Sequence, residues 1–258
     1  MIIEKLMHAL WQRRKVFFVS AFFLLLVVRA PASLLNQLVA GYYPALQLSA
    51  AEGSVWRGKV ANAGLSVNGS YLPVGELQWQ FHPWSFLVLQ PAMSVESDWP
   101  GQQVSMRLAI GFSGLSISAL RAEFPLSIIE PWAPLLVKGQ AFVAIDELQL
   151  SSSTLRRAEG LIHLRELLWL GGDVHMPLGN YQADVRTDKK IITLNVQDKQ
   201  ANLGLSGDLK IKPGGDYVMN LTAQARENLN PAVIKTLSWM GKKQTDGAIV
   251  IKRSGSWK

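Results

Sequence analysis

Alternation of apolar and polar side chains dominates the chain after residue 36 and limits the folds it can adopt. A period of two places successive side chains on opposite faces of a β-strand, so each alternating stretch has one apolar face to bury. The clearest stretches are 77–81, 104–112, 192–196, 203–211 and 217–221. Short turn signals separate them, such as Pro100-Gly101 and Pro213-Gly214-Gly215. Short connections between strands predict antiparallel neighbours.

Helical signals are few. Asn230 followed by Pro231 is typical of a helix start and Gly241 of a helix end, so a helix is expected over 231–240. A second short helix is expected over 34–41, and no long helical pattern alternates with the strands. The predicted fold is therefore mainly β: a single N-terminal transmembrane helix, then an antiparallel, elongated sheet or sandwich-like body with one short helix near the C-terminus.

Three prolines in ten residues, Pro125, Pro131 and Pro134, indicate a sub-boundary near 130–138 within this body. The chain before it is rich in tryptophan, and the strands after it are longer and more polar. Two sequential sheet regions and one continuous sheet are both compatible with this pattern.

The N-terminal segment holds thirteen uncharged residues, 16–28, and its apolar character continues to residue 35 past Arg29. A helix of about 20 residues spans a bilayer, so 16–35 is predicted to be a transmembrane signal anchor that includes Val16, Phe23 and Val28. Basic residues at 13–15 place 1–15 in the cytoplasm and 36–258 in the periplasm. A signal peptide cleaved near Ala30-Pro31-Ala32 and a buried core helix are the alternatives.

Charge and composition narrow the function classes. The net charge is +7, and residues 1–35 carry five basic residues against one acidic residue, so most of the excess precedes the folded body. A nucleic-acid-binding surface, which needs clustered basic residues on the body, is not expected. The chain has no cysteine, which excludes disulfides, thiol catalysis and thiolate metal sites.

Catalytic and metal-binding patterns are not found in the sequence. The four histidines are scattered, and neither a Gly-x-Ser-x-Gly elbow nor a phosphate-binding Gly-x-x-x-x-Gly-Lys loop occurs. The adjacent acids Asp146 and Glu147 lie in a strand-like stretch, where a bulge or a strand edge facing water is the simpler interpretation and general acid–base catalysis the alternative. Neither enzymatic activity nor a cofactor is expected.

Tryptophan-centred motifs are the remaining candidates for a functional surface. Trp56 lies between Gly53 and Gly58, and Trp79 and Trp84 flank a Gln-Phe-His-Pro segment. A Trp between glycines either closes one end of a β-core or contacts a partner. The candidate partner-contact residues are Trp56, Trp79, Trp84 and Trp99.

Several of these motifs resemble those of the type II secretion system protein N family. The resemblance is carried by Pro31-Ala-Ser-Leu-Leu, Leu46-Gln-Leu-Ser, Glu52-Gly-Ser-Val-Trp-Arg-Gly58, Leu77-Gln-Trp-Gln-Phe-His-Pro-Trp84, Asn202-Leu-Gly-Leu-Ser-Gly-Asp-Leu209, Ala225-Arg-Glu-Asn and Leu237-Ser-Trp-Met-Gly241. It covers most of the chain in order and is weakest over about 90–155. The resemblance implies a single-pass inner-membrane protein with a periplasmic body and no catalytic residues or cofactor.

The predicted function is therefore that of an accessory, non-catalytic scaffold in the type II secretion system, which exports folded proteins across the outer membrane. Its expected partners are other type II secretion subunits and the inner membrane, with a lipid as a further candidate ligand. The alternative is a periplasmic lipid or glycolipid carrier whose apolar sheet face forms a groove.

Overall fold

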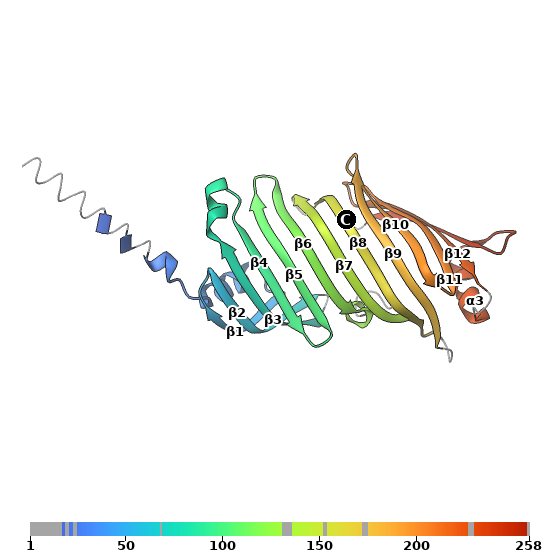
Figure 1. Cartoon of the computed structure of the whole chain (residues 1–258), viewed down its shortest axis with the longest axis horizontal. Coiled ribbons are helices and arrows are strands. Elements are labelled where there is room, and N and C mark those ends of the chain that lie inside the picture. Colours follow the sequence, from blue (N-terminus) through green and yellow to red (C-terminus); the bar gives the residue numbers. More distant parts are fainter. Residues whose placement is uncertain are drawn as a thin grey trace, which may run out of the picture.

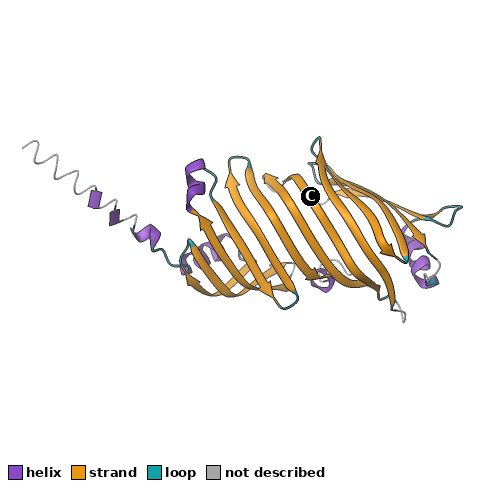
Figure 2. Ribbon diagram, viewed as in Figure 1, coloured by secondary structure: helices purple, strands orange, loops and turns teal. Residues whose placement is uncertain are grey.

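The computed structural model describes residues 17–18, 21–22, 25–67, 69–130, 136–151, 154–171, 175–226 and 230–256. The strands of these residues form one fourteen-stranded antiparallel sheet, in the order β1 to β12 followed by β14 and β13 (Figures 1 and 2). Each strand up to β12 pairs with its neighbours in sequence, so the chain runs as a meander. The predicted mainly β, antiparallel and elongated body is confirmed, as a single sheet and not a sandwich.

The strands are long at the centre of the sheet and shorter at its ends. Their bounds are β1 Leu46–Gly53, β2 Arg57–Val67, β3 Ser70–His82, β4 Ala92–Trp99, β5 Gln102–Gly111, β6 Gly114–Pro125, β7 Val137–Ser151, β8 Thr154–Trp169, β9 Met176–Asp188, β10 Ile191–Ala201, β11 Leu203–Ile211, β12 Asp216–Ala225, β13 Lys242–Lys243 and β14 Ile249–Ser256. The sheet is strongly twisted along its length (Figure 1).

Strand register converts the alternation of the sequence into two chemically different faces. Trp79 lies opposite Val95, which lies opposite Met106, so one row across the sheet is apolar. The adjacent row, on the other face, pairs Gln78 with Glu96. The apolar face is therefore the side on which the sheet builds its core.

Buried side chains on the apolar face form three clusters along the sheet. The first cluster joins β1–β5 and contains Ala32, Val60, Ala63, Trp79 and Val95. The middle cluster contains Ile145, Ala158, Val185 and Ile192. The distal cluster contains Leu126, Ala141, Leu167, Trp169, Met176, Leu178, Tyr181, Leu203, Ala223 and Val233. The core is thus a chain of local clusters spread along the length of the sheet.

Short helices close the two ends of this core. The expected helices are confirmed as α2, Ser33–Tyr42, and α3, Pro231–Met240. Leu35 of α2 packs on the first cluster, and Val233 of α3 is buried in the distal one. Two 3₁₀ helices, η1 at Pro83–Val88 and η2 at Leu126–Ile129, were not predicted from the sequence.

The sheet is continuous across the predicted sub-boundary at 130–138, of which 131–135 lie outside the described residues. Strand β6 before it pairs with β7 after it, from Leu115 opposite Leu150 to Pro125 opposite Gln140. Of the two arrangements compatible with the sequence, the structure has the single continuous sheet.

The predicted anchor is described only in part. Residues 1–15, Val16 and Phe23 lie outside the described residues, whereas Val28 ends a helical stretch and is 55% exposed. Within the part of the chain that the structure describes, no helix has both the length and the apolar character needed to cross a bilayer.

Candidate contact surfaces of the sheet

Trp56 joins the N-terminal segment to the sheet. Its indole Nε1–H donates a hydrogen bond to the carbonyl oxygen of Val27 at 2.8 Å. Its ring meets the rings of Phe81 and Phe86 edge-on, with centroids 6.0 and 5.8 Å apart. The backbone supports this junction, since the Val55 N–H donates to the Ala30 carbonyl oxygen at 2.9 Å. Trp56 is half-buried and lies where three segments distant in sequence meet.

Trp79, predicted as a partner contact, lies in the core of the sheet. The side chain is only 5% exposed, because β3 turns it onto the apolar face within the first cluster. Its indole N–H donates to the Val55 carbonyl oxygen at 3.0 Å. Gly58 allows the close packing, because a Cβ at this position would lie 2.5 Å from Trp79 Cζ2. Trp79 therefore packs the β1–β5 end together and presents little of its side chain at the surface.

Trp84 lies in η1, at the tip of the β3–β4 connection, and is 80% exposed. Trp99 is 38% exposed and lies at the other end of β4, opposite Gln102 beside the turn into β5. The structure therefore separates the tryptophans of the motifs. Trp56 and Trp84 lie near one end of strands β3 and β4, where η1 connects them, and Trp99 lies at the opposite end of β4.

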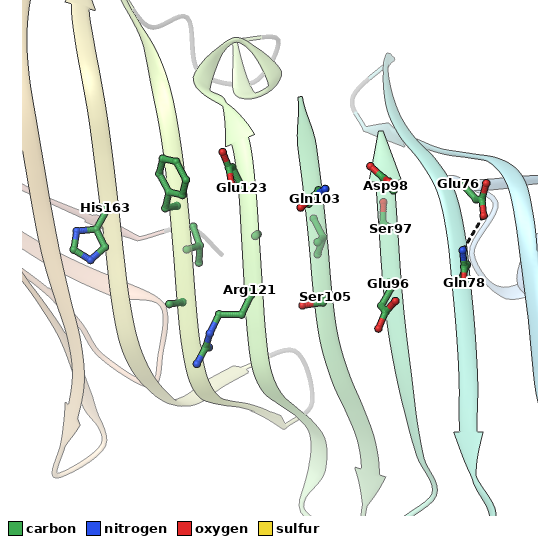
Figure 3. A pocket seen from close by; sticks show the side chains of 15 residues that line it. Glu76, Gln78, Glu96, Ser97, Asp98, Gln103, Ser105, Arg121, Glu123 and His163 are labelled. Atoms are coloured by element: carbon green, nitrogen blue, oxygen red, sulfur yellow. Dashed lines mark hydrogen bonds between the residues drawn. The ribbon is translucent and has the colours of Figure 1, made fainter. Parts of the chain in front are cut away.

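The polar face carries a hollow of about 570 Å³ over β3–β8 (Figure 3). Strand pairing creates it, because Glu76 lies opposite Asp98, which lies opposite Gln103, which lies opposite Glu123. Four carboxylates line the hollow together with the basic groups of Arg121 and His163; these acids are Glu76, Glu96, Asp98 and Glu123. The sequence did not predict this acidic hollow, because its four acids are ordinary polar positions of three different strands, β3, β4 and β6.

The adjacent acids of β7, Asp146 and Glu147, form ion pairs with neighbouring strands. The pairing of β7 with β8 shifts register between Ile145 and Glu147, which confirms the bulge expected at Asp146. The Asp146 carboxylate accepts a 2.8 Å contact from Arg121, and Glu147 lies 3.0 Å from Arg157. All of these groups are part-exposed, so they are surface ion pairs of small energetic effect. The residues described hold no cluster of three His, Asp or Glu side chains arranged for a metal.

Burial clearly perturbs the titratable side chain of Tyr181. Its side chain is 4% exposed in the distal cluster, and its hydroxyl donates to the Leu203 carbonyl oxygen at 2.9 Å. Burial raises the pKa of Tyr181 to about 12, the nearby Asp198 carboxylate adds to the increase, and the Arg226 guanidinium opposes it. Arg226 is itself bound to Asp198 at 2.7 Å. This network connects β9, β10 and β11 with Arg226, the residue that follows β12.

The fold and these surfaces define a protein built as one long antiparallel meander with an apolar segment at its N-terminus and aromatic groups at its sheet edges. Residues 44–252 match the family model described as type II secretion system (T2SS), protein N, and the chain belongs to that family. This range begins two residues before β1 and ends within β14, so the family unit coincides with the sheet.

Two curated relatives agree with the family assignment. The type II secretion system protein N of Vibrio cholerae serotype O1 is 21% identical over 223 residues, which cover 81% of this chain and 84% of the relative. That of Aeromonas hydrophila is 22% identical over 258 residues, which cover 92% and 95%. No solved structure matches the chain significantly. The matches confirm the resemblance found in the sequence and give the lipid-carrier alternative no support.

Proposed function

We propose that this protein is an accessory, non-catalytic scaffold of the type II secretion system, held in the inner membrane by the part of residues 16–35 that precedes Ala30, with its sheet in the periplasm. The rest of this range lies on the sheet, because Ala32 and Leu35 pack in the first cluster. The observation that carries the proposal is the coincidence of the family match, 44–252, with the continuous sheet. The uncharged run 16–28 behind the basic residues at 13–15 supports the anchor and its orientation.

The architecture suits a scaffold because it extends binding surfaces away from the anchor. Strands lie about 4.8 Å apart, so fourteen paired strands extend for about 60 Å along the sheet. The N-terminal segment leaves from the β1 end, and α3 lies at the far end (Figure 1). A partner at one end of the sheet is thus held at a distance from the membrane-proximal end.

Contacts with other secretion subunits are proposed around Trp99, at the β4–β5 turn. Aromatic side chains carry much of the binding energy at protein interfaces, and Trp99 is part-exposed beside the acidic residues Glu76 and Asp98 of the hollow. Trp56 and Trp84 lie toward the opposite ends of these strands, near η1.

Topology is tested with reporters fused after residue 258. A phosphatase that folds only in the periplasm is expected to be active, and a galactosidase-type cytoplasmic reporter is expected to be inactive. The opposite pair of activities would contradict the proposed orientation. A mature chain that starts near Ser33 would replace the anchor with a cleaved signal peptide.

The scaffold role is tested by photo-cross-linking in intact cells. A photo-reactive residue at Trp99 is expected to capture another secretion subunit, whereas the same residue at Trp239 on α3 serves as the control, although it is more exposed, at 76% against 38% for Trp99. A deletion strain should accumulate exported proteins in its periplasm. Equal capture at both positions, or none at Trp99, would contradict the proposed contact edge.

A further inference from the structure

Two neighbouring hairpin tips expose a group of large apolar side chains. The exposed fractions reach 80% for Trp84, 77% for Leu87 and 93% for Phe112. We define the apolar tip as Trp84, Leu87, Val88, Leu89, Ile110 and Phe112, all of which are more than 60% exposed. Contiguous exposed apolar groups of this kind mark contacts with proteins or membranes.

The two hairpin tips lie side by side because their strands pair. Ala92 at the start of β4 lies opposite Ala109 of β5, and the Ile110 N–H donates to the Pro91 carbonyl oxygen at 2.9 Å. Figure 1 shows the β3–β4 and β5–β6 connections along the same, upper border of the sheet. The apolar tip is therefore one surface made by two connections.

The backbone of η1 fixes the orientation of the apolar tip. The Ser85 hydroxyl donates to the His82 carbonyl oxygen at 2.5 Å and accepts from the Ala92 N–H at 2.8 Å, which closes the loop across its base. Leu89 ends the turn in the left-handed conformation, with φ of 54°. The exposed side chains thus project from a closed loop, and residues 83–92 contain no charged side chain.

Trp56 connects the apolar tip to the apolar N-terminal segment. One side of its ring contacts Phe86 of η1, with centroids 5.8 Å apart, and its Nε1–H bonds the Val27 carbonyl oxygen at 2.8 Å. Large apolar side chains of that segment are also exposed, with Phe17 at 70% and Leu25 at 61%. Two exposed apolar elements therefore meet at one tryptophan.

We propose that the apolar tip inserts into the bilayer interface beside the N-terminal segment, as a second membrane contact that fixes the orientation of the sheet. The proposal rests on the proposed anchor: if its uncharged run, 16–28, lies in the membrane, Val27 and Val28 at the end of that run lie near the outer face, and Trp56 holds η1 at that depth. Trp, Phe and Leu without nearby charge are the side chains that favour this interface. The same apolar surface would be poorly suited to contact with bulk water.

The test uses the full-length chain, whose lack of cysteine allows single labels. Cysteine replaces Leu87, Phe112, Leu25 or Trp239 in four variants, each labelled with the fluorophore NBD and reconstituted into phosphatidylcholine–phosphatidylglycerol vesicles. Trp239 is 76% exposed against 77% for Leu87, so it is a matched control at the far end of the sheet. Labels at positions 25, 87 and 112 are expected to emit at shorter wavelength and to be quenched several-fold by spin-labelled lipids, unlike the label at 239.

The labels separate failure of the tip from failure of the anchor. If the label at 25 is quenched by lipid but those at 87 and 112 remain in water, the proposal for the apolar tip is overturned and the anchor stands. If the label at 25 remains in water, the anchor is overturned and the placement of the tip with it. Labels at 87 and 112 that are shielded from iodide but unaffected by the spin-labelled lipids would indicate a protein contact, which also overturns the proposal.

Discussion

Replacing Trp79 with alanine should destabilise one end of the sheet and leave the other end unchanged. Trp79 is 5% exposed and packs with Val60 and Val95, so its loss opens a cavity in the first cluster. Trp-to-Ala changes in cores cost about 3–5 kcal/mol. We expect about 3 kcal/mol, because β1 and β2 lie at the free end of the sheet and can partly relax into the space.

The effect should be local because the core is divided along the sheet. The first cluster draws its residues from β1–β5 and the segment before β1, whereas the distal cluster begins at η2 and β7. In proteins whose elements contact only their neighbours, stability is the sum of local terms. An effect of 3 kcal/mol corresponds to an increase of about 10²-fold in the opening of β1–β5.

Native-state hydrogen exchange, resolved on peptides by mass spectrometry, measures this prediction in the full chain. Amides of β2–β4 should exchange about 10²-fold faster in Trp79→Ala, and those of β9–β12 should be unchanged. Trp84→Ala, at an 80% exposed position on the same end, is the control and should shift stability by less than about 0.5 kcal/mol. Equal acceleration across all strands would refute local stability, and unchanged exchange in β2–β4 would refute the packing argument.

Two further predictions concern Gly58 and Tyr181. Gly58→Ala adds a Cβ 2.5 Å from the Trp79 ring and 2.6 Å from the Glu52 carbonyl oxygen, so thermal unfolding should show a loss of about 1–3 kcal/mol. Gly41→Ala, with no neighbour within 4 Å, is the control, and equal stability of the two variants would count against the close approach. Because the folded-state pKa of Tyr181 is raised to about 12, the neutral phenol contributes fully to the free energy of unfolding below pH 10. This contribution is lost as the pH rises through 12. The wild type should lose about 2–3 kcal/mol more than Tyr181→Phe across this range in urea unfolding, and an equal loss in both proteins would contradict the assigned shift.

Local patterns determined the strands and helices, because their causes lie within a few residues. Alternation predicted the antiparallel strands, and Asn230 before Pro231 predicted α3. The family resemblance was equally visible, since its glycine–tryptophan motifs keep their order along the chain. The irregular segments η1 and η2 were missed, because neither has a periodic pattern that distinguishes it from a loop.

Strand register and strand order determine which side chains are exposed on each surface, and neither can be predicted from a short stretch of sequence. Trp79 and Trp84 lie five residues apart in one motif, yet the first is buried by β2 and β4 and the second projects beyond the end of β3. Glu76, Asp98 and Glu123 share a hollow only because three strand pairings align them. Trp56 reaches Val27 across 29 residues. The sequence alone thus determined which residues form strands, while the tertiary structure determined which faces and edges those strands present, because side-chain exposure depends on neighbours that are distant in the chain.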